Sequence, residues 1–169
     1  MAVPFDQGYI CLNYDETSIN ASQGRYVPTS LWNLTEDAWK GKVAIPSPVT
    51  SSPGRAFMIA TTDYFANDDD QNTDWTDWWS AMQDNDVIIT SGWTEAYETH
   101  YTGGYGVWND DHVGDANFVV SYCHSPGVEA YWGDNYTIST SLTLDRASFH
   151  QVEYATIVNG TKNAEYANL

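Results

Sequence analysis

A short β-branched run followed by a glycine and regularly spaced aromatic residues sets the expected fold class of this chain. Residues 87–90, Val-Ile-Ile-Thr, follow an Asp-Asn-Asp turn and are typical of a buried parallel strand. Beyond Gly92, the aromatic residues Trp93, Tyr97 and Tyr101 recur at every fourth position, which predicts one face of a helix. Ligands in open α/β sheets bind outside the carboxyl ends of the strands. We therefore expect Trp93 at a ligand-binding edge.

The rest of the chain shows the same alternation of strand-like and helix-like patterns. Strands are expected at residues 8–14, 42–45, 87–90, 117–122, 137–144 and 151–158. Helices are expected at residues 31–39, 53–64, 75–82, 93–101, 125–132 and 163–167. Such alternation implies right-handed crossovers, and so an α/β three-layer sandwich with a mostly parallel central sheet. No internal repeat and no Gly-, Ser- or Pro-rich linker divides the sequence, so we expect one unit over residues 1–169.

The charge balance narrows the classes of partner. Six basic and 23 acidic residues give a net charge of −17 and a pI near 4.1. Such a surface repels phosphate backbones and anionic membranes, which argues against nucleic-acid binding and favours cationic ligands. No apolar run approaches the ~20 residues that span a bilayer, and no leader precedes Val3 in this sequence. Sequons at Asn20, Asn33, Asn135 and Asn159 would permit glycosylation of an exported protein.

The two cysteines and the acidic loops give weaker signals. Cys11 and Cys123 fall in separate predicted strands and could pair if those strands are neighbours, but two buried thiols are the favoured interpretation. Residues 67–74 match the first ligand positions of a calcium-binding EF-hand loop, yet Thr73 stands where that loop needs glycine. Residues 109–112 lack a third clear metal ligand. No metal site is expected.

A helix start at residues 50–54 offers a second candidate contact. The sequence Thr-Ser-Ser-Pro-Gly supplies capping oxygens, a proline suited to the first helical turn and a glycine that permits close approach to the backbone. The N–H groups and the positive end of the helix dipole could hold a phosphate or hydroxyl group near Ser51. An ordinary capped helix shows the same pattern.

Several segments together resemble the thiamine-binding solute-binding proteins of ABC importers. They are Pro4-Phe5-Asp6-Gln7-Gly8-Tyr9, Thr50-Ser51-Ser52-Pro53-Gly54, Gly92-Trp93-Thr94-Glu95-Ala96-Tyr97, Ser121-Tyr122-Cys123-His124-Ser125-Pro126 and Gln151-Val152-Glu153. The resemblance implies a two-lobed type II periplasmic-binding-protein fold, of which this chain is the second lobe only. Interlobe strands would lie near residues 3–9 and 150–158, and the first lobe would be absent from this chain.

The same resemblance assigns roles to single residues. It places Trp93 and Tyr122 among aromatic walls around thiamine and Ser51 near its hydroxyethyl or phosphate end. Asp6 and Tyr97 lie in matching motifs. The thiazolium ring is a permanent cation, and an indole facing it contributes roughly 0.5–2 kcal/mol. The alternative for Trp93 and Tyr122 is an ordinary place in the core.

The leading functional hypothesis is therefore a binding module. It would be the solute-binding component of an ABC importer, extracytoplasmic, taking thiamine or a thiamine phosphate as transported ligand and membrane permease subunits as partners, with no cofactor. Another small cation, such as a polyamine or ferric ion, is the first alternative, and a free-standing interaction domain is another. A thiaminase-like enzyme lobe would need an activated nucleophile beside a base. Cys123 and His124 are adjacent in a strand and so face opposite sides, and no Gly-x-Ser-x-Gly motif occurs, so no catalytic residue is assigned.

Overall fold

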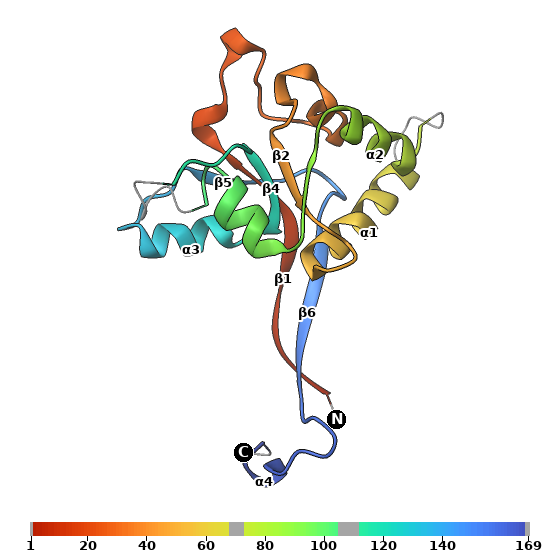
Figure 1. The fold of residues 1–169 in the computed structure, drawn as a ribbon, viewed down its shortest axis with the longest axis vertical. Coiled ribbons are helices and arrows are strands. Elements are labelled where there is room, and N and C mark those ends of the chain that lie inside the picture. The colour runs from red at the N-terminus through yellow and green to blue at the C-terminus, as the bar shows by residue number, and fades with distance from the viewer. Residues whose placement is uncertain (1, 68–72, 105–111, 168–169) are drawn as a thin grey trace.

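A single mixed sheet between two helical layers forms the body of the protein (Figure 1). The computed structural model describes residues 2–67, 73–104 and 112–167. The strands are β1 (Ala2–Asp15), β2 (Val43–Pro46), β3 (Ile88–Thr90), β4 (Phe118–Tyr122), β5 (Ser139–Leu142) and β6 (Phe149–Thr156). Their order is β3-β2-β4-β1-β5, and β6 pairs with β1.

The strand directions make the sheet mostly parallel, with one strand reversed. β2 is parallel to both β3 and β4. β1 runs antiparallel to β4, β5 and β6, so β4 and β5 point the same way on either side of it. The expected fold class is confirmed, and the reversed strand β1 is the feature that strand–helix alternation does not predict.

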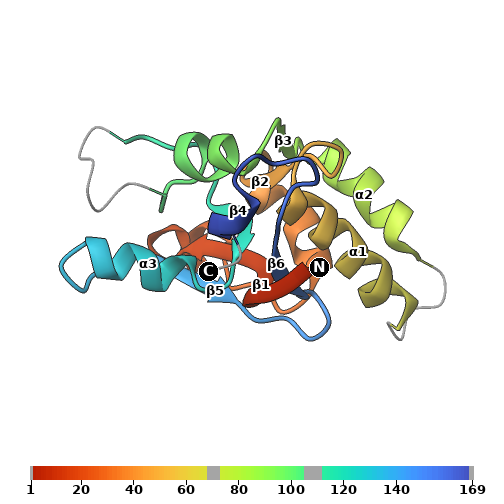
Figure 2. The same ribbon diagram turned by 90° about the horizontal axis from the view of Figure 1, so that it is seen from below.

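Helices cover both faces of this sheet, as Figure 2 shows. The helices are α1 (Ser52–Ala66), α2 (Trp75–Asp84), α3 (Ser125–Trp132) and α4 (Ala164–Ala167), with short 3₁₀ turns η1 (Glu16–Ser18), η2 (Ala21–Gln23), η3 (Leu31–Thr35) and η4 (Asp37–Trp39), and the π-helix η5 (Glu95–His100). α1, α2 and η3 pack on one face through the larger core cluster, and η5 covers the other through a smaller one. Among the described residues, none of these helices is long and apolar enough to cross a bilayer.

The residue pattern of β1 explains why its two faces differ. Ile10, Leu12 and Tyr14 belong to the larger core beneath α1 and α2. The residues between them, Asn13 and Cys11, are buried on the opposite face. That face therefore carries the polar side chains on which the candidate site is built.

Two expectations about local structure were wrong. Residues 31–39 do not form one helix: Glu36 is extended (φ −71°, ψ 147°) and separates η3 from η4. β3 is not a fully buried strand, because it lies at the edge of the sheet and Ile89 is 49% exposed. On α1, Phe57 and Ala60 are buried and Tyr64 is half-buried.

The interpretation of the cysteines as free thiols was also wrong. Cys11 and Cys123 form a disulfide with their Cα atoms 5.4 Å apart. The two cysteines come together because β1 and β4 pair as antiparallel strands. The pairing continues one residue beyond β4, where the Cys123 N–H donates to the Tyr9 carbonyl (2.8 Å). Neither cysteine therefore offers a thiol nucleophile.

A long two-stranded ribbon extends from the sheet and carries both ends of the described chain (Figure 1). In it, β1 pairs with β6 from Ala2↔Thr156 to Ile10↔Phe149, with an irregularity between Pro4 and Asp6. Much of its apolar surface is exposed, including Phe5 at 68%.

The loops considered for metal binding lie largely outside the described residues, which omit 68–72 and 105–111. Within the described part of the chain, no group of three or more His, Cys, Asp or Glu side chains is placed to hold a metal ion.

Candidate functional site

Three parallel strands end at one edge of the sheet, and the sequence-predicted site residues follow them. Ser51 precedes α1 after β2, Trp93 follows β3, and Tyr122 ends β4. The loops at this edge are tied together: the Ser47 N–H donates to the Thr90 carbonyl (2.9 Å) and the Thr50 hydroxyl to the Ser91 carbonyl (2.6 Å). The edge is thus a connected surface, as expected for a ligand site in an α/β sheet.

Part of this edge forms a cavity of about 270 Å³, here called the aromatic pocket. It is lined by Trp93, Tyr97, Tyr122, His124, Ser125, Val128 and Glu129. The rings of Trp93 and Tyr122 meet edge to face with centroids 6.3 Å apart, and both are only partly buried. They are therefore available as walls for a guest.

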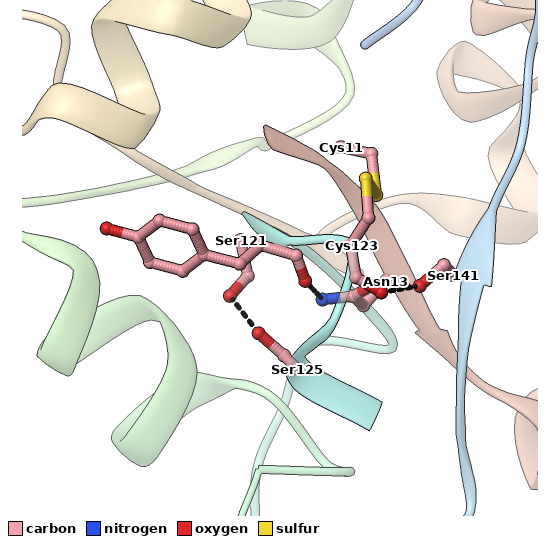
Figure 3. Close-up of a disulfide and its surroundings, with 7 residues drawn as sticks. Cys11, Asn13, Ser121, Cys123, Ser125 and Ser141 are labelled. Carbon is pink, nitrogen blue, oxygen red and sulfur yellow. Dashed lines mark hydrogen bonds between the residues drawn. A yellow bond between two sulfur atoms is a disulfide. The ribbon is translucent and has the colours of Figure 1, made fainter. Parts of the chain in front are cut away.

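Trp93 is held from two sides. Its ring stacks on Tyr97 with centroids 5.0 Å apart and planes 17° apart, and its Nε1–H donates to the Ser121 hydroxyl (2.7 Å). The Ser121 hydroxyl in turn lies 3.0 Å from that of Ser125 at the start of α3, as Figure 3 shows. Both hydroxyls are buried, so these bonds fix the orientation of the indole.

The turn before Trp93 is also fixed. The carboxylate of Glu95 accepts hydrogen bonds from both the backbone N–H (2.8 Å) and the hydroxyl (2.6 Å) of Ser91. These donors lower the pKa of Glu95. The turn leads into η5, where the Tyr101 N–H bonds to the Ala96 carbonyl (3.0 Å), a π-type spacing. Tyr97 and Tyr101 still share a face, with centroids 5.4 Å apart.

Tyr122 is positioned through its backbone. The Asn13 side chain donates to the Tyr122 carbonyl (3.0 Å), and the Ser141 hydroxyl donates to the Cys123 carbonyl (2.5 Å), beside the disulfide to Cys11 (Figure 3). Burial, and secondarily the charge of Glu153, raises the pKa of the Tyr122 hydroxyl.

An acidic residue, Glu129 of α3, also lines the pocket and is 4% exposed. Its carboxylate accepts hydrogen bonds from the hydroxyls of Tyr97 (2.6 Å), Ser139 (3.0 Å) and Thr137 (3.1 Å). Burial raises the pKa of Glu129, against the opposing effect of its three donors. Burial, together with the neighbouring Glu129, also raises the pKa of Tyr97, so its hydroxyl stays protonated and remains a donor.

The other two predicted residues lie outside the aromatic pocket. Ser51 is the N-cap of α1, is 7% exposed and makes no side-chain capping hydrogen bond. Asp6 is exposed on β1 and lines a small adjoining groove together with Tyr122 and Glu153. The structure thus brings Trp93, Tyr97 and Tyr122 together, puts Asp6 beside Tyr122, and leaves Ser51 on the same edge but apart.

Sequence reasoning missed the polar groups that hold the rings, chiefly Glu129, Ser121 and Ser125. One signal was present: Ser125 and Glu129 are four residues apart in a predicted helix and therefore share a face. Nothing in the sequence indicated that this face is buried against Tyr97 and β5.

The first 101 residues match the family model described as bacterial extracellular solute-binding protein. The chain belongs to this family. It is also 27% identical over 167 residues to the thiamine-binding periplasmic protein of Escherichia coli, covering 98% of this chain and 43% of that one. The chain therefore spans less than half the length of this relative.

Solved structures agree on the fold. A periplasmic thiamin-binding protein matches 98% of this chain with a TM-score of 0.72 and 24% identity, over 45% of its own length. The sulfate-binding protein SubI of Mycobacterium tuberculosis matches with a TM-score of 0.66 and 15% identity, over 98% of this chain and 50% of that one. The architecture is that of one lobe of a periplasmic binding protein. The family is one of extracytoplasmic solute-binding transport proteins rather than enzymes.

Proposed function

We propose that this chain is a ligand-binding lobe for thiamine or a thiamine phosphate in the solute-binding component of an ABC importer. The observation that carries the proposal is the aromatic pocket, a cavity lined by Trp93, Tyr97 and Tyr122 together with the acidic residue Glu129. The similarity to thiamine-binding periplasmic proteins over nearly the whole chain supports the same ligand.

The ligand's chemistry fits the pocket. The thiazolium ring is flat, apolar on its faces and permanently positive, so it gains both from burial against Trp93 and from cation–π attraction. The chain has a net charge of −17, and this negative charge attracts a cationic ligand over long range.

Two further residues would contact the ends of the ligand. Ser51 is the N-cap of α1 and its side chain makes no capping hydrogen bond, which suits a contact with the hydroxyethyl or phosphate end. Asp6 faces the groove beside Tyr122 and would add a negative charge near the pyrimidine or thiazolium ring.

A second lobe would close over this edge. The ribbon of β1 and β6 has the exposed apolar surface and the paired strands of an interlobe hinge near residues 3–9 and 150–158. In this proposal the first lobe packs beyond the ribbon and the closed protein docks on membrane permease subunits. Binding by the isolated lobe would be weak because half of the ligand's surface would stay in water.

Isothermal titration calorimetry on the native, full-length gene product tests the ligand. We expect heat with thiamine and thiamine monophosphate, and weaker binding after Trp93→Ala. Spermidine and ferric ion serve as the competing cations. Binding of either one without any heat from thiamine would overturn the proposal.

A further inference from the structure

The charge environment of Glu129 is unusual for a buried carboxylate. Within residues 2–67, 73–104 and 112–167, its hydrogen-bond donors are neutral hydroxyls, those of Tyr97, Ser139 and Thr137. The ion pairs among the described residues are Lys40 with Asp86 and His100 with Asp115, and neither involves Glu129.

One described basic side chain, His112, acts on the carboxylate of Glu129, and its effect is weak. The His112 ring has the smallest of the effects on the pKa of Glu129, and its Nε2 is hydrogen-bonded to the Tyr101 carbonyl (2.7 Å). Buried charges in proteins are ordinarily paired, because an unpaired charge loses its hydration energy and gains no compensating electrostatic attraction. In the described part of the chain, this carboxylate forms no ion pair.

We propose that Glu129 is the specificity-determining residue that makes the aromatic pocket select a positively charged ring. The guest would supply the counter-charge that no ion pair among the described residues provides. Glu129 lies on the wall of the same cavity that Trp93 and Tyr122 line. It also positions Trp93 through the Tyr97 hydroxyl, since Tyr97 stacks on the indole. The inference deepens the proposed function and rests on the same pocket.

Substitution by glutamine separates charge from geometry. A glutamine at position 129 can accept the Tyr97 hydroxyl with its oxygen and donate its amide to the oxygens of Ser139 and Thr137, because hydroxyls can reverse their roles. The hydrogen-bond network then survives while the negative charge is lost. A merely structural role for Glu129 would leave the preference for charged over neutral guests unchanged.

The experiment compares thiamine with 3-deazathiamine, in which a carbon replaces the thiazolium nitrogen and removes the charge. In the native gene product we expect thiamine to bind more tightly. Glu129→Gln should lower the affinity for thiamine by about tenfold and leave that for 3-deazathiamine unchanged. Glu129→Asp, which keeps the charge, should keep the preference. Glu36→Gln is the matched control, since Glu36 is exposed and its hydrogen bond from Asn33 (2.7 Å) survives.

A second probe pair makes the result independent of the identity of the natural ligand. N-methylpyridinium and toluene have the same shape and differ in charge, and nuclear magnetic resonance of the Trp93 indole reports their entry. A preference for N-methylpyridinium over toluene that is lost in Glu129→Gln would support the inference, whether or not thiamine binds. A failure of thiamine to bind would overturn only the proposed ligand. Equal responses to the two probes, no response to the cation, or an unchanged preference in Glu129→Gln would overturn the inference.

Discussion

The indole Nε1–H of Trp93 donates to the hydroxyl of Ser121 at 2.7 Å, which ties the edge strand β3 to the centre of the sheet at the mouth of the aromatic pocket. Trp93 thus has a fixed orientation before any ligand arrives. A preorganised wall costs little side-chain entropy on binding.

The first prediction concerns this wall. Trp93→Ala should lower the affinity for thiamine by about 1–2 kcal/mol, because it removes both the cation–π attraction and the apolar contact. Trp93→Phe should lower the affinity for thiamine by less, because phenylalanine keeps an aromatic face toward the ligand. It still loses the hydrogen bond to Ser121. Calorimetry at one salt concentration measures both.

The control for Trp93 is Trp75→Ala. Trp75 is 37% exposed on α2, in the helical layer on the opposite face of the sheet from η5. Its removal should leave the affinity for thiamine unchanged. Identical affinities for the Trp93→Ala and Trp75→Ala variants would contradict a role for the indole in binding.

The parts of the fold that depend on local patterns could be predicted from the sequence. Runs rich in β-branched residues predicted the parallel strands β2, β3 and β4. The four-residue spacing of Trp93, Tyr97 and Tyr101 predicted a helical face, which is kept in the π-helix η5. Because parallel strands end at one edge, the same patterns also located the candidate site.

Features that depend on non-local pairing could not be predicted. The reversal of β1 brings Cys11 beside Cys123 and turns Asn13 toward Tyr122, and both contacts join residues more than a hundred positions apart. Local periodicity carries no signal for such register. The burial of Glu129 likewise depends on β5, whose Ser139 reaches the carboxylate only in the folded sheet.

The second prediction concerns the disulfide, which closes a loop with a sequence separation of 112. Replacing both cysteines, Cys11→Ala with Cys123→Ala, should lower the free energy of unfolding by about 2–4 kcal/mol, chiefly because the unfolded chain regains freedom. Urea unfolding of the variant and of the oxidised wild type measures this. Wild type treated with a reductant should match the variant, and a wild type indifferent to the reductant would contradict the pairing.

The third prediction is a pH dependence of stability that originates at Glu129. Its pKa in the folded protein is raised from the ordinary value of 4.5. Just above pH 4.5 the native state keeps a proton that the unfolded chain has released, so the native state binds more protons. Stability must then fall as the pH rises through this window, and level off above the raised pKa.

The comparison that isolates this effect is wild type against Glu129→Gln in urea unfolding from pH 4 upward. The stability of wild type should decline relative to the variant as the pH rises, because glutamine does not titrate. A constant difference across the range would show that the pKa of Glu129 is not raised. Addition of N-methylpyridinium should reduce the decline, since a bound cation stabilises the ionised carboxylate.

The fourth prediction uses the repeated Ser-Pro-Gly sequence at the starts of α1 and α3. A Cβ atom at Gly54 would lie 2.0 Å from the Pro46 carbonyl oxygen, whereas at Gly127 nothing lies within 4 Å. Gly54 therefore lets α1 approach the end of β2, and Gly127 serves no such contact. Gly54→Ala should destabilise the protein by about 1–3 kcal/mol, because backbone must move.

Gly127→Ala is the matched change in the same sequence context and should stabilise the protein by about 0.4–1 kcal/mol, since alanine restricts the unfolded chain at a helical position. Thermal unfolding of the two variants should thus shift in opposite directions. Because Ser51 is the N-cap of α1, Gly54→Ala should also weaken binding of thiamine monophosphate more than binding of a ligand held by the aromatic pocket alone. Equal stability of the two variants would mean that α1 is not pressed against the end of β2.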